Sequence, residues 1–214
     1  MEKRTLGRSG MEAAPLAFGG NIFGWTANEQ QSHNLLDAFV AAGFNLIDTS
    51  DSYSRWVPGH VGGESETVIG SWLKKSGQRN NVLIATKVGS DMGLGHTCLS
   101  KKYIVDEVEN SLRRLQTDYI DLYQTHFDDT TTPVGETLEA YAQLIKEGKV
   151  RAIGASNLSA ERLRESLQYS KDNNLPRYET FQPEYNLYKR ENYEQEYRAL
   201  CVEENLGVIN YFAL

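Results

Sequence analysis

The sequence has few cysteines, no long apolar run and no cluster of basic residues, and each absence excludes a class of protein. The two cysteines among 214 residues, Cys98 and Cys201, are too far apart in the chain to form a close-spaced metal or redox motif. We expect two free thiols in a reducing compartment. No apolar stretch reaches the ~18 residues of a membrane span, and the first residues lead into no apolar signal sequence. A cytoplasmic protein with no membrane partner is therefore expected.

Acidic residues also outnumber basic ones. Lysine and arginine total 22 against 29 acidic residues, which gives a formal net charge of −7. With no run of basic residues, nucleic acid is not an expected partner. No Gly-x-Gly-x-x-Gly motif follows the first predicted strand, so a Rossmann dinucleotide site is not indicated. His60 and His96 lack the spacing and the carboxylate neighbours of a metal site, so no metal is expected.

Short apolar runs alternate with amphipathic stretches along the whole chain. From the second run onward they recur about every 28–38 residues, the length of a βα unit, and no short hairpin turns separate them. This favours a parallel sheet. The predicted strands are Leu16–Gly19, Asn45–Thr49, Val82–Lys87, Tyr119–Gln124, Val150–Ala155, Glu179–Gln182 and Gly207–Phe212.

Helix signals fill most of the gaps between these strands. Asn28 to Gln31 has the pattern of a capping box ahead of an apolar stripe. Thr132-Pro133 places proline at a first helical position, and Ser159 is a predicted cap. Further stripes run from Ile104 to Leu115 and from Tyr193 to Leu200. We find no linker and expect one domain over residues 1–214.

The expected fold is α/β, a (β/α)8 TIM barrel with only about seven βα units in this chain. A closed barrel of this type needs eight strands, whereas the seventh predicted strand ends close to Leu214. Strands one and seven would then keep open edges. Either the barrel is truncated or association fills the gap, and the isolated polypeptide is expected to be poorly soluble and to bind cofactor weakly.

Four polar residues fall at the ends of predicted strands or in the loops after them: Asp48, Tyr53, Lys87 and His126. The carboxyl ends of barrel strands meet at one face, so these side chains are expected to converge. A lysine ammonium beside a tyrosine favours the phenolate and would lower the pKa of the phenol. A carboxylate can hold the lysine, and an imidazole can donate to an oxygen. Each residue alone could equally be a cap, a packing or a solvated side chain.

The sequence also holds two longer motifs, the first of which contains Asp48 and Tyr53. Gly43–Tyr53 (GFNLIDTSDSY), followed by Gly63–Gly70 (GESETVIG), resembles the first signature of the aldo-keto reductases. Leu144–Asn157 (LIKEGKVRAIGASN) resembles the mid-barrel signature of that family. The segment from Arg4 to Gly10 and the stretch ending at His126 resemble the branch that holds aryl-alcohol dehydrogenases and potassium-channel β-subunits.

The resemblance implies an oxidoreductase that reduces aldehydes or ketones to alcohols by hydride transfer from NADPH. Tyr53 would be the general acid, Lys87 and Asp48 its partners, and His126 the residue that orients the substrate. The small-molecule carbonyl substrate would meet an apolar wall formed by Trp25, Trp56 and Phe127.

The same resemblance implies which residues bind NADP(H). Ser156, Asn157 and Gln182 would bind the nicotinamide carboxamide, and Tyr211 would stack under its ring. The family contacts that clamp the adenosine 2′-phosphate lie in a segment absent here. The remaining cofactor residues implied by the resemblance lie near the first strands: Gly20, Asn21 and Asp48.

Two alternatives stay open. The protein could be a cofactor-sensing regulatory subunit of the channel β-subunit type, which keeps the same pocket. It could also be an inactive truncated remnant.

Overall fold

The computed structural model describes residues 2–213 and contains one large parallel sheet. Its seven strands pair in sequence order, each with the next along the chain. They are β3 (Ala17–Gly19), β4 (Leu46–Asp48), β5 (Leu83–Val88), β6 (Ile120–Thr125), β7 (Val150–Ser156), β8 (Tyr178–Gln182) and β9 (Gly207–Val208). The predicted succession of parallel strands is confirmed.

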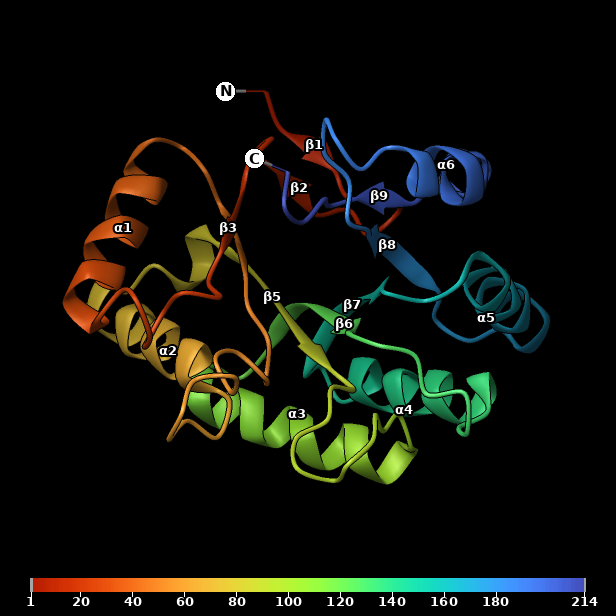
Figure 1. Ribbon diagram of the computed structural model, residues 1–214, viewed down its shortest axis with the longest axis horizontal. Coiled ribbons are helices and arrows are strands. Elements are labelled where there is room, and N and C mark those ends of the chain that lie inside the picture. Colours follow the sequence, from red (N-terminus) through yellow and green to blue (C-terminus); the bar gives the residue numbers. More distant parts are fainter. Residues whose placement is uncertain (1, 214) are drawn as a thin grey trace.

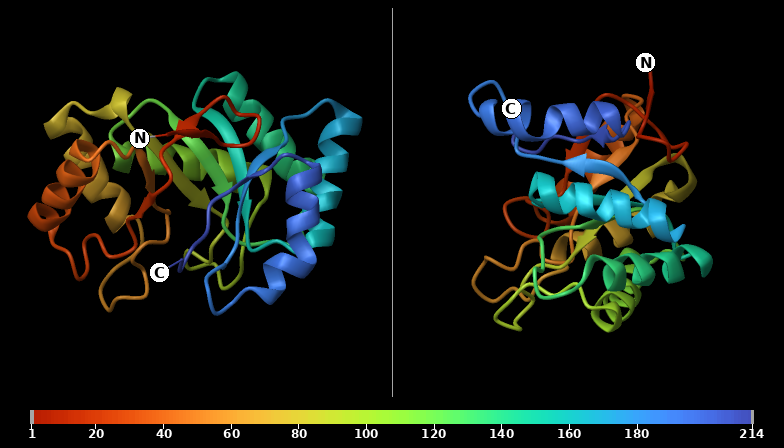
Figure 2. Two further views of the ribbon diagram at one scale, coloured as in Figure 1. Left: turned by 90° about the horizontal axis from the view of Figure 1, so that it is seen from above. Right: turned by 90° about the vertical axis from the view of Figure 1, so that its right-hand side faces the viewer.

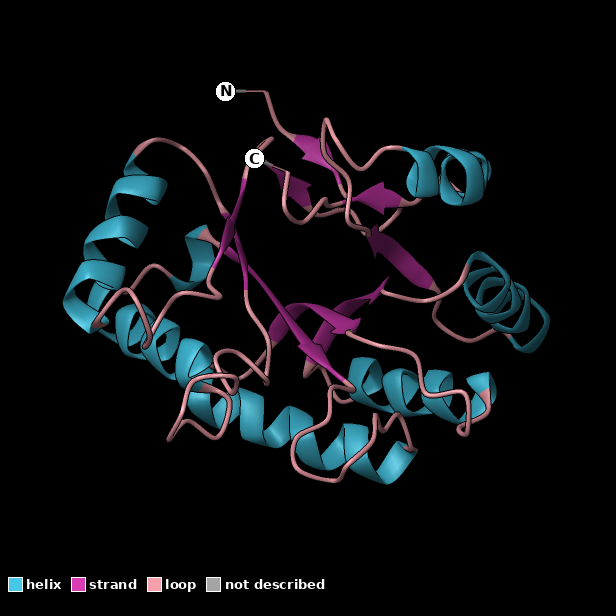
Figure 3. Ribbon diagram, viewed as in Figure 1, coloured by secondary structure: helices cyan, strands magenta, loops and turns pink. Residues whose placement is uncertain are grey.

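Helices follow the strands and lie on the outer side of the curled sheet (Figure 1, Figure 3). They are α1 (Glu29–Ala41), α2 (Glu64–Ser76), α3 (Lys101–Leu115), α4 (Val134–Lys146), α5 (Ala160–Asn173) and α6 (Arg198–Glu203), with a π-helical turn at Tyr193–Tyr197 and a 3₁₀ turn, Arg79–Asn81. Helix α2 is absent from the sequence-based prediction. None of the helices in residues 2–213 combines the length and apolarity that crossing a bilayer requires.

The helix ends follow from local side-chain chemistry. At α1 the Asn28 carboxamide oxygen accepts from the Gln31 backbone N–H, and the Gln31 side chain accepts from the Asn28 N–H, which is the predicted capping box. Ser159 caps α5 by accepting from the Arg162 N–H. Pro133 is the N-cap of α4 and not its first helical residue, a shift of one position.

The sheet curls into part of a barrel, and its end strands β3 and β9 are not paired with each other within residues 2–213. The predicted fold, a (β/α)8 barrel present over about seven units, is therefore confirmed. Strand β9 was expected to run to Phe212 but ends at Val208. Its neighbour β8 is followed by Pro183, which has no N–H to continue the ladder. Beyond it, Tyr211 makes only an isolated bridge to Glu184.

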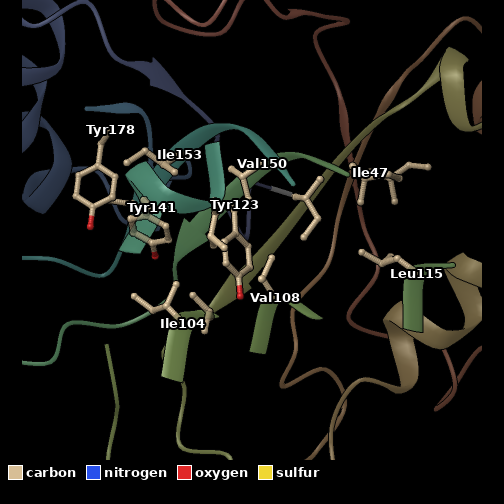
Figure 4. Close-up of a cluster of buried hydrophobic side chains, with 14 of the residues drawn as sticks. Ile47, Ile104, Val108, Leu115, Tyr123, Tyr141, Val150, Ile153 and Tyr178 are labelled. Carbon is tan, nitrogen blue, oxygen red and sulfur yellow. The ribbon is translucent and has the colours of Figure 1, made fainter. Parts of the chain in front are cut away.

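Helices and sheet enclose the main apolar core (Figure 4). Side chains from α3, such as Ile104 and Val108, pack against Tyr123 of β6 and its neighbours. Tyr141 of α4 and Tyr178 of β8 are fully buried or nearly so and share a hydrogen-bond partner, the Thr125 hydroxyl, at 2.8 Å each. This layer fixes where each strand stands and therefore where its carboxyl end points.

A hairpin that the sequence pattern did not indicate covers the amino end of the sheet's concave face. Its strands are β1 (Arg4–Thr5) and β2 (Glu12–Ala13). Figure 2 shows it at the opposite end of the strands from the loops that follow them. The hairpin contributes to a second apolar cluster: Leu6, Met11, Ala13, Leu46, Ala85, Leu122, Ala152 and Ile209.

The second cluster lies directly beneath the polar layer of the candidate site. Because side chains two residues apart share one face of a strand, Leu46, Ala85 and Leu122 point to the same side as the residues two positions later. Those later residues are Asp48, Lys87 and Gln124. The apolar layer therefore closes the amino end of the sheet, and the polar layer faces its carboxyl end.

Candidate active site

The structure brings the four predicted polar residues together at the carboxyl end of the sheet. Asp48 ends β4, Lys87 lies near the end of β5, His126 follows β6 and Tyr53 lies in the loop after β4. The Lys87 Nζ is 2.7 Å from Asp48 Oδ2 and 3.2 Å from the Tyr53 hydroxyl. The rings of Tyr53 and His126 meet edge to face with centroids 5.9 Å apart. The convergence expected from strand ends is observed.

The Lys87 ammonium is buried and fully hydrogen-bonded. Its side chain is 1% exposed, and its three hydrogens are matched by Asp48 Oδ2, the Thr49 carbonyl at 2.8 Å and the Tyr53 hydroxyl. Burial by itself lowers the pKa of Lys87, but Asp48 and Tyr53 outweigh burial and raise that pKa above its ordinary value. Lys87 therefore carries its charge at neutral pH.

Tyr53 corrects one expectation. Its pKa is raised, not lowered, because burial of the phenol outweighs the opposing effect of Lys87, and Asp48 adds to the rise. Lys87 acts in the expected direction but does not determine the sign. At neutral pH the phenol keeps its proton, with a charged donor 3.2 Å from its oxygen.

His126 is an uncharged imidazole with a crowded Nδ1. Burial, and then the charge of Lys87, hold the pKa of His126 well below its usual range. Its Nδ1 lies 3.0 Å from the Ser50 hydroxyl and 2.9 Å from the Ser90 hydroxyl. Since Nδ1 faces these two serines, Nε2 lies on the opposite edge of the ring.

Asp48 is the centre of the polar layer. Besides Lys87, its carboxylate accepts from Gln124 Nε2 at 3.1 Å and from Gln182 Nε2 at 3.2 Å, both through Oδ1. Gln124 fits because its neighbour in the sheet is Gly154, where a β-carbon would lie 3.1 Å from Gln124 Cγ and 2.2 Å from the Thr180 hydroxyl. The carboxylate is thereby held by donors from three strands.

The residues expected to bind the nicotinamide form one hydrogen-bonded group beside His126. Asn157 donates to the His126 carbonyl at 2.9 Å and accepts from the Tyr211 hydroxyl at 3.1 Å. Ser156 donates to the Gln182 carbonyl at 2.8 Å. A cavity of ≈ 290 Å³ borders this group and is lined by Asn157, Leu158, Ser159, Phe181, Pro183, Glu184, Asn192, Tyr197 and Tyr211.

Gly20 and Asn21 follow β3 at the same end of the sheet. The Gly20 N–H donates to the Asp48 carbonyl at 2.8 Å, and its own carbonyl accepts from Ser65 at 2.7 Å. A β-carbon at position 20 would lie 2.8 Å from Ser65 Oγ, so the close approach of α2 accounts for glycine here. No hydrogen bond of the Asn21 side chain is present within residues 2–213.

The three aromatic residues expected at the substrate side also meet around Tyr53 and His126. Trp56 lies 5.7 Å from Tyr53 and 6.0 Å from Trp25, centroid to centroid, with edge-to-face geometry in both pairs. Phe127 stacks on His126 at 4.6 Å. Trp25, Trp56 and Phe127 are 48%, 51% and 42% exposed, so together they present apolar surface beside the phenol.

Three polar residues of the site were missed from the sequence: Ser50, Ser90 and Gln124. Ser50 and Ser90 follow strand ends, and Gln124 stands two residues before His126, so the strand-end criterion itself could have found them. Neutral hydroxyl and amide side chains are common at such positions and draw no attention by charge. Within residues 2–213, no group of three or more histidine, cysteine or acidic side chains is arranged to hold a metal.

Comparison with known proteins shows to which family the sequence of this chain is similar. The sequence model of the Aldo/keto reductase family matches residues 15–214. Aldo-keto reductase YhdN of Bacillus subtilis (strain 168) is 38% identical over 198 residues, covering 89% of this chain and 56% of that protein. A probable voltage-gated potassium channel subunit beta of Oryza sativa subsp. japonica is 32% identical, covering 100% of this chain and 64% of that protein.

A third relative, aryl-alcohol dehydrogenase GME11368 of Pestalotiopsis microspora, is 30% identical over 96% of this chain and 57% of its own length. The chain therefore spans less than two thirds of each of these relatives. The family match covers nearly the whole chain and includes all four converging residues. This chain belongs to the aldo/keto reductase family.

Proposed function

We propose that the protein containing this chain reduces aldehydes or ketones to alcohols, with Tyr53 as the proton donor. When bound, NADPH would supply the hydride that the carbonyl carbon accepts. The Tyr53 hydroxyl gives its proton to the carbonyl oxygen, so a C–H and an O–H bond form and a phenolate remains. The observation that carries the proposal is the Lys87 ammonium, bonded to both Asp48 and the Tyr53 hydroxyl.

Lys87 makes the proton transfer easier without needing to ionise Tyr53 beforehand. A protonated phenol is the form required of an acid, and the ammonium stands where negative charge develops as the proton leaves. Asp48 keeps the ammonium in place and charged. The interaction is stronger than it would be in bulk water, because Lys87 is buried where the effective dielectric constant is lower.

His126 and the aromatic side chains orient the substrate in this proposal. With Nδ1 facing Ser50 and Ser90, Nε2 is the ring nitrogen available to a carbonyl oxygen beside Tyr53. Trp25, Trp56 and Phe127 supply a partly exposed apolar wall, which suits aromatic or medium-chain carbonyl compounds.

The nicotinamide would be held by Ser156, Asn157 and Gln182, with Tyr211 against its ring. The protein backbone at Gly20 and Asn21 would pass near the cofactor. The fit is supported by chemistry, because carboxamide and hydroxyl side chains can both donate to and accept from a nicotinamide carboxamide. A cavity of ≈ 290 Å³ borders Asn157 and Tyr211, near the lower end of the ~300–1,000 Å³ range of ligand sites. The use of NADPH as the cofactor is part of the proposal.

A regulatory role is a second candidate, supported by the 32% identity to a probable potassium channel subunit beta. In that case the same pocket would bind cofactor, and a partner protein would respond to it. The assignment of residues 1–214 to one barrel domain, the cytoplasmic location and the absence of nucleic-acid partners stay predictions from the sequence.

The test is steady-state oxidation of NADPH and of NADH by the full-length protein with a panel of aromatic and aliphatic aldehydes. Tyr53→Phe should lower kcat by about 10²–10⁴-fold while cofactor binding, followed by fluorescence, is unchanged, because only the proton donor is deleted. Survival of kcat within about tenfold would exclude Tyr53 as the acid. Cofactor binding without turnover on any carbonyl would favour the regulatory role.

A further inference from the structure

A chain of buried hydrogen bonds leads from His126 to a carboxyl group that the proposed chemistry does not use. His126 Nδ1 lies 3.0 Å from Ser50 Oγ, and Ser50 Oγ lies 2.9 Å from Asp51 Oδ1. Ser50 and Asp51 are both 0% exposed, and His126 is 8% exposed. The hydrogen bonds therefore run from the nearly buried His126 into the interior of the protein.

Ser50 has a single hydrogen, so it cannot donate to both neighbours. Its oxygen also accepts from the Ser52 N–H at 3.2 Å and lies 3.0 Å from the Ser52 hydroxyl. If Asp51 is a carboxylate, the Ser50 hydrogen points to Asp51, and Nδ1 of His126 can bond to Ser50 only as a donor. If Asp51 is a carboxylic acid, it donates to Ser50, and the Ser50 hydrogen is free for Nδ1. The ionisation of Asp51 thus sets the direction of the hydrogen bonds that join Asp51, Ser50 and His126.

The surroundings of Asp51 favour the acid form. Arg114, on α3, is engaged with two other buried carboxylates, since its guanidinium contacts Glu66 and Glu107 at 2.6 Å each. No cation is left to pair with Asp51, and its Oδ2 has no partner within residues 2–213. The hydroxyls of Tyr103 and Tyr123 on neighbouring elements are likewise unpartnered there.

Electrostatics agree with this count of charges. Burial raises the pKa of Asp51 well above its ordinary value, and Glu66 and Glu107 raise it further. The hydrogen bond from Ser50 and the charge of Arg114 act in the opposite direction but do not reverse the rise of the Asp51 pKa. One proton shared among three buried acids and one arginine relieves the excess of negative charge.

We propose that Asp51 is a positioning residue that, as a carboxylic acid, donates to Ser50, so that Ser50 donates to Nδ1 of His126 and holds the imidazole with its hydrogen on Nε2. The placement of that hydrogen beside a carbonyl substrate rests on the proposed function, whereas the tautomer itself does not. Ser90, 2.9 Å from the same nitrogen, makes no other side-chain hydrogen bond within residues 2–213. Its hydroxyl can donate to a bare Nδ1 or accept from a protonated Nδ1, so it is compatible with either tautomer of His126.

The direct test is the tautomer of His126, read from ¹⁵N chemical shifts of the histidine-labelled full-length protein at neutral pH. Only four histidines are present, and the His126→Gln variant assigns the signal by its loss. The wild type should show a protonated Nε2 and a bare Nδ1. A protonated Nδ1 in the wild type overturns the proposal, whether or not the protein reduces carbonyls.

Three variants separate the Asp51–Ser50 route from Ser90. Ser90→Ala should keep the Nε2–H tautomer, because Ser50 alone then donates to Nδ1, and a change to the Nδ1–H form would overturn the proposal. Asp51→Asn should keep the Nε2–H tautomer, because the neutral amide can still donate to Ser50, and a change of tautomer would show that Asp51 is ionised in the wild type. Ser50→Ala should populate the Nδ1–H form and lower kcat/KM about tenfold, equivalent to about 1.4 kcal/mol. Ser71→Ala, which removes a hydroxyl of the outer helix α2 that donates to Glu29, is the matched control and should leave both unchanged.

The His126 tautomer and the turnover together distinguish a failure of this proposal from a failure of the proposed function. A wild type with the Nε2–H tautomer that shows no turnover would contradict the reductase assignment and leave the role of Asp51 standing. An active protein in which Ser50→Ala keeps the wild-type tautomer would leave the reductase assignment standing and overturn the role of Asp51. Should Ser50→Ala fail to fold, the Ser90→Ala and Asp51→Asn spectra decide by themselves.

Discussion

Replacing Lys87 by methionine should weaken both the fold and the chemistry of the site. Methionine keeps most of the apolar stem and removes the ammonium, whose three hydrogen bonds run to Asp48, Thr49 and Tyr53. Breaking a buried ion pair by removing one partner typically costs 3–5 kcal/mol, since the remaining charge is buried without compensation. Here Asp48 keeps the amide donors of Gln124 and Gln182. We therefore expect a loss of about 3 kcal/mol in the free energy of unfolding, the lower end of that range.

The stability difference should depend on pH in a defined direction. The pKa of Lys87 is raised in the folded protein, so its stabilising contribution is fully present below the unfolded value of about 10.4 and is lost as pH rises through the folded pKa. The gap between wild type and Lys87→Met should be constant from about pH 6 to 9 and should narrow above about pH 10.4. A gap that widened in alkali would show that the charge on Lys87 is not what stabilises the site.

The assay combines urea unfolding at several pH values with steady-state turnover. Lys87→Met should also lower kcat by at least about 10²-fold, because the departing proton leaves a phenolate with no adjacent cation. Lys74→Met, at an exposed position of α2, is the matched control and should change stability by less than about 0.5 kcal/mol. A Lys87→Met protein with wild-type stability and turnover would refute the assigned role of the ammonium.

The strands were predictable because their apolar runs are short, evenly spaced and separated by helical stripes. The same pattern failed where pairing, not hydrophobicity, decides the length of a strand. Gly207–Phe212 has the apolar pattern of a strand, but its partner β8 ends at Gln182. The next residue, Pro183, has no N–H to donate to the ladder and only accepts, from the Tyr211 N–H at 3.0 Å. Hairpin β1–β2 has two residues per strand, too few for an alternation to be visible.

In the site, the charged and aromatic residues were found, while the neutral Ser50, Ser90 and Gln124 were not, and Gln182 was expected only as a nicotinamide ligand. Asp48 and Lys87 stand out at strand ends, but nothing in the sequence tells that Gln124 would donate to Asp48 or that Ser50 would face His126. The sign of the Tyr53 pKa shift was also out of reach. A neighbouring lysine can be guessed from strand order, whereas the burial that outweighs it depends on the packing of the whole loop.

Three further predictions concern the substrate side, acid stability and the open edges. Trp25→Ala and Trp56→Ala should raise KM several-fold more for an aromatic aldehyde than for a small aliphatic one, since each removes apolar wall, and equal effects would indicate packing only. The lowered pKa of His126 means that its contribution to stability is present above about pH 6.5 and is lost as pH falls. Wild type should therefore lose up to about 1.4 kcal/mol per pH unit more than His126→Gln below that pH, by urea unfolding, whereas parallel losses would contradict it. Finally, β3 and β9 each lack a partner on one side within residues 2–213. A parallel edge of this kind pairs readily with another chain, so the 214-residue polypeptide studied alone should associate in light scattering after size exclusion. Val208→Lys, at an exposed position of β9, should shift the polypeptide toward monomer, because a charge on an edge strand opposes pairing. A monodisperse, cooperatively melting wild-type monomer would show that the curled sheet is self-sufficient.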